Sequence, residues 1–470
     1  MNNEYFDHKY IKNIEPLYGK LRNKDYDANL LKYNRIPNKY SILDRIDMTD
    51  KEVYSIDPKG CEDVDDAFSI YFEGEELFLA IHIADPTEYI NIESELWSNT
   101  VNTLITRYPS NKKPIHMMPK EILNKSTLKE NENGNIKKAL TILVKIDKNN
   151  YNPILNPELL FTQIKVKKDN ALDYLTASTL INKIKAFEIG LEISNKLQKL
   201  RGKKTIGVKL NEVSTSIINY DSKGPYLYNN TFNEKLMRLM ISEFAIFSNT
   251  FIGKYLVQNC YGYGLFRTCG ASDFIKNISD KNLTGDEILQ EIITNGIKAN
   301  YKNDKTKHDL VGSKEYTHFT SPIRRISDCI CHYLLKYVYL KNNNINIDVP
   351  FDIDYLQHIS EQCNIKSSEM KSIQHRDNKF RLLQIINRML KDNIPVKISY
   401  YIKGYKSVFL NLTVNKINDF NVYLPYTVMV SNYNYIHNPK KIYTLNINQV
   451  NCLERFDTGT IPELDREFII

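Results

Sequence analysis

The chain has 470 residues, of which 42% are hydrophobic, and a formal net charge of +7 at pH 7. These values predict a globular protein with more than one domain, and the mild positive charge permits a polyanionic partner without requiring one. A membrane protein is excluded, because no apolar run approaches the roughly 18 residues of a membrane span. The opening residues, MNNEYFDHKY, also lack the apolar stretch of a secretory signal.

Seven cysteines are present, an odd number, and no two of them form a CxxC pair. They are Cys61, Cys260, Cys269, Cys329, Cys331, Cys363 and Cys452. Free thiols are therefore expected in place of disulfides, in a protein of a reducing compartment, and we expect a cytoplasmic location without a membrane partner.

The predicted elements change character along the chain. Residues 1–45 are polar and predict an N-terminal arm with one or two short helices. Short β-prone runs follow at 52–56, 67–72, 76–83, 140–147 and 159–166. Apolar residues at helical spacing then predict helices at 171–200, 233–258, 321–340 and 353–392.

A second change follows at about residue 393, where four or five short strands occur in a row. This pattern is typical of a small β-barrel or sandwich, which we place at residues 393–457, with a tail at 458–470. The chain is thus predicted to be an α+β protein, with a mixed sheet and packed helices in residues 46–392.

The loop between the first two predicted strands is rich in carboxylates. Four aspartates, Asp57, Asp63, Asp65 and Asp66, fall within ten positions of the segment SIDPKGCEDVDDAFSI. Carboxylates this close repel one another, and a divalent cation with hard oxygen ligands relieves the repulsion. An exposed acidic loop is the alternative. A calcium EF-hand loop does not fit, because Phe68 stands where that loop has glycine, so magnesium is the better match.

A second motif, YTHFTSPIRRISDCICH, occupies residues 316–332. Its pattern predicts a loop at a helix start, with Ser321 as the N-cap. One interpretation is a basic helix N-terminus on the surface. The other places Arg324, Arg325 and free backbone N–H groups against a phosphate.

Both motifs resemble signatures of the ribonuclease II and ribonuclease R family, whose catalytic domain is called RNB. The family has an isoleucine–aspartate pair followed by D-x-D-D-A, and later H-F-T-S-P-I-R-R, in the same order as here. The resemblance covers roughly residues 45–390. Within it, Tyr108 in LITRYPSNKKPIHMMP, Tyr174 in ALDY and Glu243 in SEFAIFSN are similar to family positions near the RNA.

The resemblance implies a 3′-to-5′ exoribonuclease that threads single-stranded RNA into a channel and hydrolyses it to nucleoside 5′-monophosphates. It implies Mg²⁺ as the cofactor, with Mn²⁺ as a substitute. The expected metal ligands are Asp57, Asp63 and Asp66. Asp65 is expected to orient the attacking water or accept its proton, and Arg324 to stabilise charge on the phosphate. The expected RNA contacts are Tyr108, Tyr174, Glu243 and Arg325.

The family usually carries one or two nucleic-acid-binding barrels of the cold-shock type before the catalytic domain, and residues 1–45 are too few to hold one. A protein partner that supplies such barrels is one interpretation, and the chain is otherwise expected to be a monomer. The C-terminal strands resemble the OB/S1-like barrel that usually follows the catalytic domain.

Other functions remain open at this point. A catalytically reduced RNA-binding or scaffold protein of the same fold is the main alternative, and an endonuclease or a DNA-cleaving enzyme is another. Zinc at Cys329, Cys331 and His332 is not expected, because positions i and i+2 of a helix point to different faces. The basic run RGKK at residues 201–204 is either an RNA contact or a solvated surface.

Overall fold

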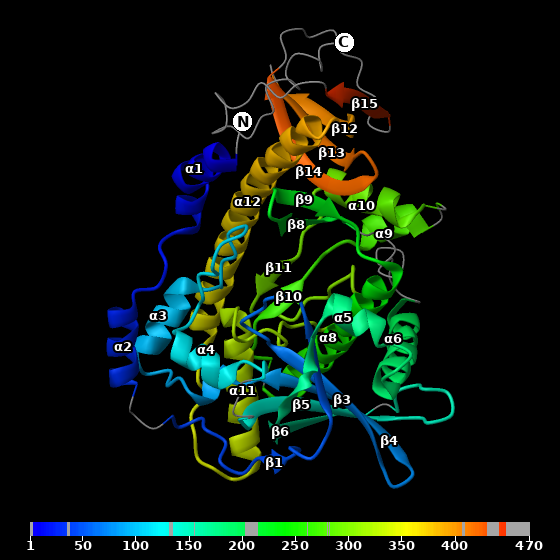
Figure 1. Cartoon of the computed structure of the whole chain (residues 1–470). Helices are drawn as coiled ribbons and strands as arrows, with labels where there is room; N and C mark the ends of the chain where they lie inside the picture. The colour runs from blue at the N-terminus through cyan, green and yellow to red at the C-terminus, as the bar shows by residue number, and fades with distance from the viewer. Residues whose placement is uncertain are drawn as a thin grey trace.

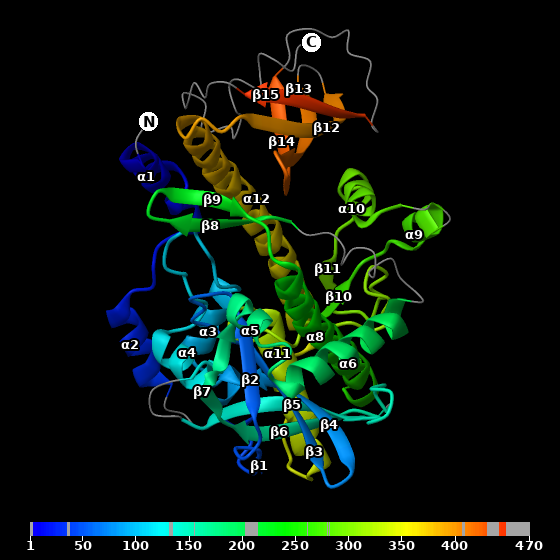
Figure 2. The same cartoon turned by 45° about the vertical axis from the view of Figure 1, so that its right-hand side comes forward.

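The computed structural model describes most of the chain, namely residues 3–34, 38–130, 135–154, 156–202, 215–260, 262–279, 281, 283–406, 409–429 and 441–447. The predicted tail at 458–470 and two lysines of the RGKK run, Lys203 and Lys204, lie outside these residues. The described fold is α+β, as the sequence predicted, with a mixed sheet, helices around it and a second, smaller sheet (Figures 1 and 2).

The main sheet has seven strands in the order β1-β6-β5-β4-β3-β2-β7. The strands are β1 (Ile46–Asp47), β2 (Val53–Asp57), β3 (Asp66–Glu73), β4 (Glu76–Ala84), β5 (Lys137–Ile146), β6 (Glu158–Ile164) and β7 (Val166–Asp173). Only the β1–β6 and β2–β7 pairs are parallel. The central strand β4 is buried along most of its length, because apolar side chains cover both of its faces.

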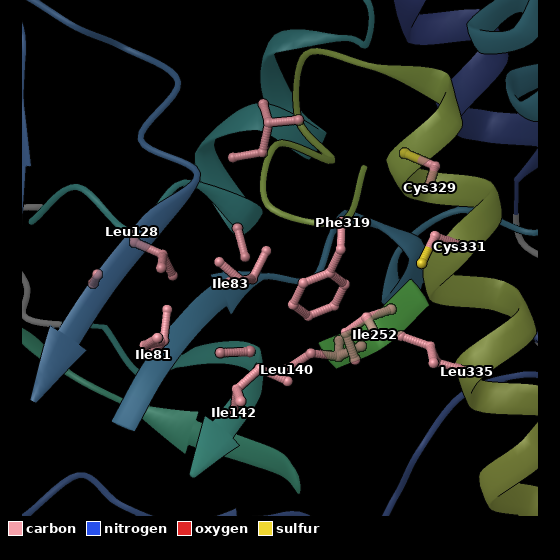
Figure 3. Packing of buried hydrophobic residues seen from close by; sticks show 14 of the residues in the cluster. Ile81, Ile83, Leu128, Leu140, Ile142, Ile252, Phe319, Cys329, Cys331 and Leu335 are labelled. Carbon is pink, nitrogen blue, oxygen red and sulfur yellow. The ribbon is translucent and has the colours of Figure 1, made fainter. Parts of the chain in front are cut away.

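Helices cover this sheet and supply the other half of its core. They are α3 (Glu95–Thr103), α4 (Lys120–Ser126), α5 (Tyr174–Thr179), α6 (Lys185–Gly202), α8 (Phe232–Asn259), α11 (Ile326–Asn342) and the first part of α12 (Ile353–Lys391). Two further helices, α9 (Ser272–Ser279) and α10 (Gly285–Thr294), share a small core of their own. Figure 3 shows Ile83 of β4 and Leu140 of β5 facing Ile252 of α8, with Phe319 between the sheet and α11. A capping box between Thr231 and Glu234 fixes the start of α8.

Two helix predictions need correction. The segment 171–200 was predicted as one helix, but its first residues belong to strand β7, where Leu172 pairs in parallel with Ile56 of β2. The helix predicted from residue 321 begins only at Ile326, and its N-cap is Arg325. Sheet pairing outweighs local helical spacing in the first case, and a hydrogen-bonded loop replaces the first turn in the second.

The N-terminal segment forms α1 (Asn3–Asn13), a 3-10 helix η1 (Glu15–Tyr18) and α2 (Lys24–Tyr33). Near the C-terminus lies an antiparallel sheet in the order β14-β13-β12-β15, made of β12 (Val396–Lys406), β13 (Phe409–Ile417), β14 (Phe420–Met429) and β15 (Ile442–Ile447). The fourth strand returns beside the first, which is the Greek-key order on which OB barrels are built. Two antiparallel strand pairs complete the fold: the hairpin of β8 (Ile217–Asp221) with β9 (Gly224–Tyr228), and β10 (Phe266–Thr268) with β11 (Asn300–Lys302), which α9 and α10 separate in the chain.

Helix α12 joins the two parts of the molecule. Leu356 and Ile359 near its start belong to the core of the main sheet. Phe380 and Ile386 near its end belong to a second core, shared with α1 and the C-terminal sheet. Figure 1 shows α12 running from the main sheet up to strands β12 to β15. In the part of the chain that the structure describes, no helix has both the length and the apolar character needed to cross a membrane.

Candidate active site

The carboxylate loop is held between two adjacent strands. Asp57 ends β2, and Asp66 begins β3, while Tyr54 pairs with Phe68 at the base of the loop. Gly60 turns the loop with φ +81°, a conformation that side chains with a Cβ rarely adopt. The two strands therefore bring both ends of the acidic segment to one edge of the sheet.

The two sequence motifs meet at Asp65. Its Oδ1 accepts a hydrogen bond from the backbone N–H of Ile323 at 2.8 Å, and its Oδ2 accepts one from Arg324 Nε at 2.9 Å. The Asp65 carboxylate is 2% exposed, whereas the Arg324 side chain is 44% exposed. Arg324 is thus anchored on one side by Asp65 and open to solvent on the other.

Side chains from two helices hold the second motif in its loop conformation. Asp328 of α11 accepts hydrogen bonds from the N–H of Ser321 at 2.8 Å and from Arg325 at 2.7 and 2.9 Å. Asn249 of α8 accepts one from the N–H of Phe319 at 2.9 Å. Ser321 is not the N-cap that the sequence predicted, because its Oγ instead accepts a hydrogen bond from Arg324 Nη2 at 2.9 Å.

Asp57 and Asp66 are buried carboxylates whose charged forms are disfavoured. Burial, followed by the charges of Asp66 and Asp65, raises the pKa of Asp57 to about 8. Burial raises the pKa of Asp66 to about 6, against the opposing charges of Arg324 and Arg325. The Oδ2 atom of Asp57 is buried and has no hydrogen-bond partner. A cation beside these two carboxylates would relieve both the repulsion and the unsatisfied oxygen.

Asp63 lies in a different environment from its neighbours. Its Oδ2 accepts a hydrogen bond from the Tyr108 hydroxyl, and the Cys61 thiol lies 3.6 Å from its Oδ1. Burial and the Asp63 charge raise the pKa of Tyr108 well above its usual range, so the hydroxyl remains a donor. The Tyr108 residue is 38% exposed, so it reaches both Asp63 and the open side of the site.

Tyr174 and Glu243 are placed by the helices that carry them. Tyr174 begins α5, and the Arg238 guanidinium lies 4.0 Å from its ring centroid. Burial, and then the charges of Asp66 and Asp57, raise the pKa of the Tyr174 hydroxyl. Glu243 of α8 is 1% exposed and forms an ion pair with Arg201 of α6, with Nε–Oε2 at 2.7 Å.

The site therefore gathers Asp57, Asp63, Asp65, Asp66, Arg324, Arg325, Tyr108 and Tyr174, while Glu243 lies in a buried ion pair on α8. The sequence reasoning missed Asn249 and Arg238 as members of this region, and it left Arg201, in the RGKK run, open between an RNA contact and a solvated surface. Asn249 stood within the same helix segment as Glu243, SEFAIFSN, and that segment was the signal that could have identified it. Arg238 carries no comparable signal, because its position depends on how α8 packs beside α5.

The donors present fit a hard divalent cation. Among the described residues, no three His, Cys, Asp or Glu side chains converge closely enough to form a ready-made metal shell. Magnesium, however, is usually bound by one or two carboxylates together with water and substrate phosphate. Asp57 and Asp66 provide such a pair, and the unsatisfied Asp57 Oδ2 is an available ligand atom.

Comparisons with known proteins agree with the motifs. Residues 45–341 match the model of the RNB domain. The chain is 26% identical over 329 residues to the mitochondrial exoribonuclease II of Saccharomyces cerevisiae, covering 62% of this chain and 34% of that protein. It is 22% identical over 391 residues to ribonuclease R of Mycoplasmopsis pulmonis, covering 75% and 53%. The chain thus spans about a third to a half of the length of these relatives.

Two solved structures are similar in fold. Mycoplasma genitalium RNase R in complex with ribose-methylated single-stranded RNA has a TM-score of 0.74 at 16% identity, covering 97% of this chain and 76% of that one. Yeast Ssd1, a pseudonuclease, has a TM-score of 0.62 at 16% identity, covering 81% and 50%. At these identities the likeness establishes the fold alone.

Proposed function

Because the chain belongs to the RNB domain family, we propose that it is a magnesium-dependent ribonuclease that degrades single-stranded RNA from the 3′ end. Its products would be nucleoside 5′-monophosphates. The observation that carries the proposal is the junction of the two motifs, where Asp65 anchors a half-exposed Arg324 near the buried carboxylates Asp57 and Asp66. This arrangement pairs a cation site with a guanidinium that can face a phosphate.

The proposed roles follow from these positions. Asp57 and Asp66 would hold Mg²⁺, or Mn²⁺ in its place, with Asp63 on the side of Tyr108. When bound, the metal would supply Lewis-acid polarisation of the scissile phosphate and activation of water. Arg324 would donate its free N–H groups to the phosphate oxygens, where negative charge develops.

Asp65 would act on both Arg324 and the attacking water. It fixes the orientation of Arg324 through the Nε contact, and it lies next to Asp66 in the chain. It is therefore the candidate to orient the attacking water or to accept its proton. Arg325 would contribute positive charge to the same region while Asp328 holds its side chain.

The proposed RNA contacts lie in different surroundings. Tyr108 presents a partly exposed ring beside Asp63, which suits stacking on a base. Tyr174 has Arg238 over one face of its ring, so a nucleotide would use the other face or the edge. Glu243 would contribute to RNA binding while it stays paired with Arg201. Through this ion pair, Arg201 of the RGKK run would have an indirect role in binding RNA.

Organisation and setting complete the proposal. We propose a catalytic unit at residues 46–392, preceded by the arm at 1–45 and followed by the OB/S1-like unit at 393–457. Helix α12 ends at Lys391, and its second half packs with both flanking units, which supports this division. A cytoplasmic monomer, with a protein partner supplying RNA-binding barrels, remains the proposed setting.

A non-catalytic RNA-binding protein is the second candidate, because yeast Ssd1, a pseudonuclease, has a similar fold. Retention of the four aspartates and of both arginines favours the enzyme. The two candidates differ in one direct observable, which is whether RNA is shortened.

The test compares linear RNA labelled at its 5′ or 3′ end with circular RNA and single-stranded DNA of the same sequence, with Mg²⁺, Mn²⁺ or EDTA. The proposal predicts loss of the 3′ label as mononucleotide, stepwise shortening of the 5′-labelled RNA, and no product with EDTA. Cleavage of circular RNA would make the protein an endonuclease. Binding without cleavage under every metal would favour the RNA-binding candidate.

A further inference from the structure

The segment that carries Tyr108 has little regular structure, but it is fixed at its base. The N–H of Thr106 donates to the carbonyl of Arg324 at 3.0 Å, in the second motif. Arg107 and Ile115 exchange backbone hydrogen bonds of 3.0 and 2.8 Å, which close the segment into a narrow loop. Tyr108 stands on this loop, where its hydroxyl reaches Asp63.

The tip of the same loop is held by α12. The N–H of Ser110 donates to Asp377 Oδ2 at 3.0 Å, and Arg381 Nη2 donates to the carbonyl of Ser110 at 2.9 Å. Asp377 is 1% exposed and Arg381 is 2% exposed. A carboxylate this buried needs several hydrogen-bond donors, and the loop provides only one of them.

The N-terminal arm provides the others. The hydroxyls of Tyr10 and Tyr18 donate to the same Asp377 Oδ2 at 2.9 and 2.8 Å. Arg107, next to Tyr108, donates through Nη1 to the carbonyl of Tyr18 at 2.7 Å. Gly19 makes this approach possible, because a Cβ at its position would lie 2.8 Å from Arg107 Nη1, and its φ is +87°.

Three segments far apart in the sequence thus meet at one buried oxygen, and one of them bears a residue of the proposed active site. The arm and α12 contact the Tyr108 loop at its tip and beside Tyr108 itself, while the opposite end of Tyr108 binds Asp63. Figures 1 and 2 both show α1 beside the upper part of α12.

We propose that Asp377 is a positioning residue for Tyr108, and that the N-terminal arm belongs to the catalytic machinery through it. Tyr10 and Tyr18 hold the Asp377 carboxylate in place, and Asp377 with Arg381 holds Ser110, so that the Tyr108 hydroxyl stays on Asp63. The effect on RNA cleavage rests on the proposed function, but the effect on the position of Tyr108 does not.

The test combines kinetics with a spectroscopic probe. Asp377→Asn removes the charged acceptor with little change in volume, and Tyr18→Phe removes one donor while keeping the ring. Each is measured alone and in the Tyr108→Phe background, as kcat and KM for shortening of RNA. The matched control is Glu361→Gln, an exposed carboxylate on the same helix, bonded only to Gln357 at 3.3 Å among its described contacts.

If Asp377 positions Tyr108, the effects of Asp377→Asn and Tyr108→Phe on kcat should not add in a double-mutant cycle. Asp377→Asn alone should lower kcat on the order of tenfold to a hundredfold, as misplacement by about 1 Å can do. In the Tyr108→Phe background the same change should cost less than about twofold, because the hydroxyl that it positions is already absent. Equal losses in both backgrounds would overturn the proposal.

The probe is 3-fluorotyrosine at position 108, observed by fluorine NMR in the RNA-free protein. Asp377→Asn and Tyr18→Phe should both move its resonance toward that of a solvent-exposed tyrosine, whereas Glu361→Gln should leave it unchanged. An unmoved resonance in a folded Asp377→Asn or Tyr18→Phe protein would also overturn the proposal. If wild type cleaves no RNA, the proposed function fails, while this readout still decides the positioning role.

Discussion

Replacing Arg324 with lysine tests whether the guanidinium geometry matters. Arg324 uses Nε for Asp65 at 2.9 Å and Nη2 for Ser321 at 2.9 Å, while 44% of its side chain remains exposed. A lysine ammonium is a single point donor, so it cannot hold Asp65 and also present a fork to a phosphate. Arg324→Lys keeps the charge and removes only this geometry.

The expected loss in rate is on the order of 10²–10³-fold, or about 3–4 kcal/mol, as for removal of one donor from an oxyanion site. The expected loss in stability is smaller, below about 1 kcal/mol, because the guanidinium is partly exposed and solvent screens the pair. Single-turnover cleavage of a short labelled RNA measures the first, and urea unfolding measures the second.

The matched control is Arg388→Lys, since Arg388 also pairs with a carboxylate. It binds Asp221 through two nitrogens, at 2.8 and 2.9 Å, in a pair that does not involve the site. The control should cleave RNA at close to the wild-type rate. If Arg324→Lys retains a rate within about threefold of wild type, then Arg324 does not stabilise the developing charge and the assignment of its role is wrong.

Three further predictions follow from buried charges. Asp57→Asn should raise the melting temperature of metal-free protein by roughly 1 °C for each kcal/mol of relieved repulsion, because the entropy of unfolding grows with chain length. The same change should abolish the increase that Mg²⁺ causes in wild type. Scanning calorimetry with Mg²⁺ or EDTA checks both, and an unchanged response to Mg²⁺ would contradict the metal site. Lys336 is fully buried between Asp85 and Glu88, each 2.9 Å away. Lys336→Met should therefore destabilise the protein by about 3–5 kcal/mol, as measured by urea unfolding. A cost below about 1 kcal/mol would show that the two ion pairs of Lys336 are dispensable. Burial opposes ionisation of Glu88, but Lys336 and Arg45 outweigh it and lower the pKa of Glu88 to about 2. Because the folded pKa lies below the unfolded value of about 4.3, Glu88 contributes stability above that value and loses it as the pH falls toward 2. The free energy of unfolding should therefore decline over this range, and less steeply in Glu88→Gln.

Much of the RNB domain could be predicted because its signals are local. The acidic segment around Asp57 to Asp66 lies between strands whose apolar residues are contiguous in sequence, and β2 and β3 form there. The helix predicted at 233–258 matches α8, because its start has a capping box and its interior is apolar. Where helical spacing of apolar residues occurs together with an N-terminal cap, the sequence is enough to predict the helix.

The errors and omissions arise where distant residues decide the structure. Residues 171–173 carry helical spacing, yet they add to the sheet because the edge of β2 is free to pair with them. The buried acceptor Asp377 sits in a long helix with no motif around it, and its three donors come from residues 10, 18 and 110. No pattern in the local sequence connects these positions.

The most direct test of the central claim is a cleavage and binding time course with Asp65→Asn, set beside Asp169→Asn, whose carboxylate is exposed on β7. Labelled single-stranded RNA is incubated with Mg²⁺, and binding is measured in the same samples by filter retention. We predict that wild type and Asp169→Asn shorten RNA from its 3′ end to mononucleotides. Asp65→Asn should bind RNA with similar affinity and cleave it at least about 10²-fold more slowly. Cleavage by Asp65→Asn at the wild-type rate, or no cleavage by wild type, would contradict the central claim.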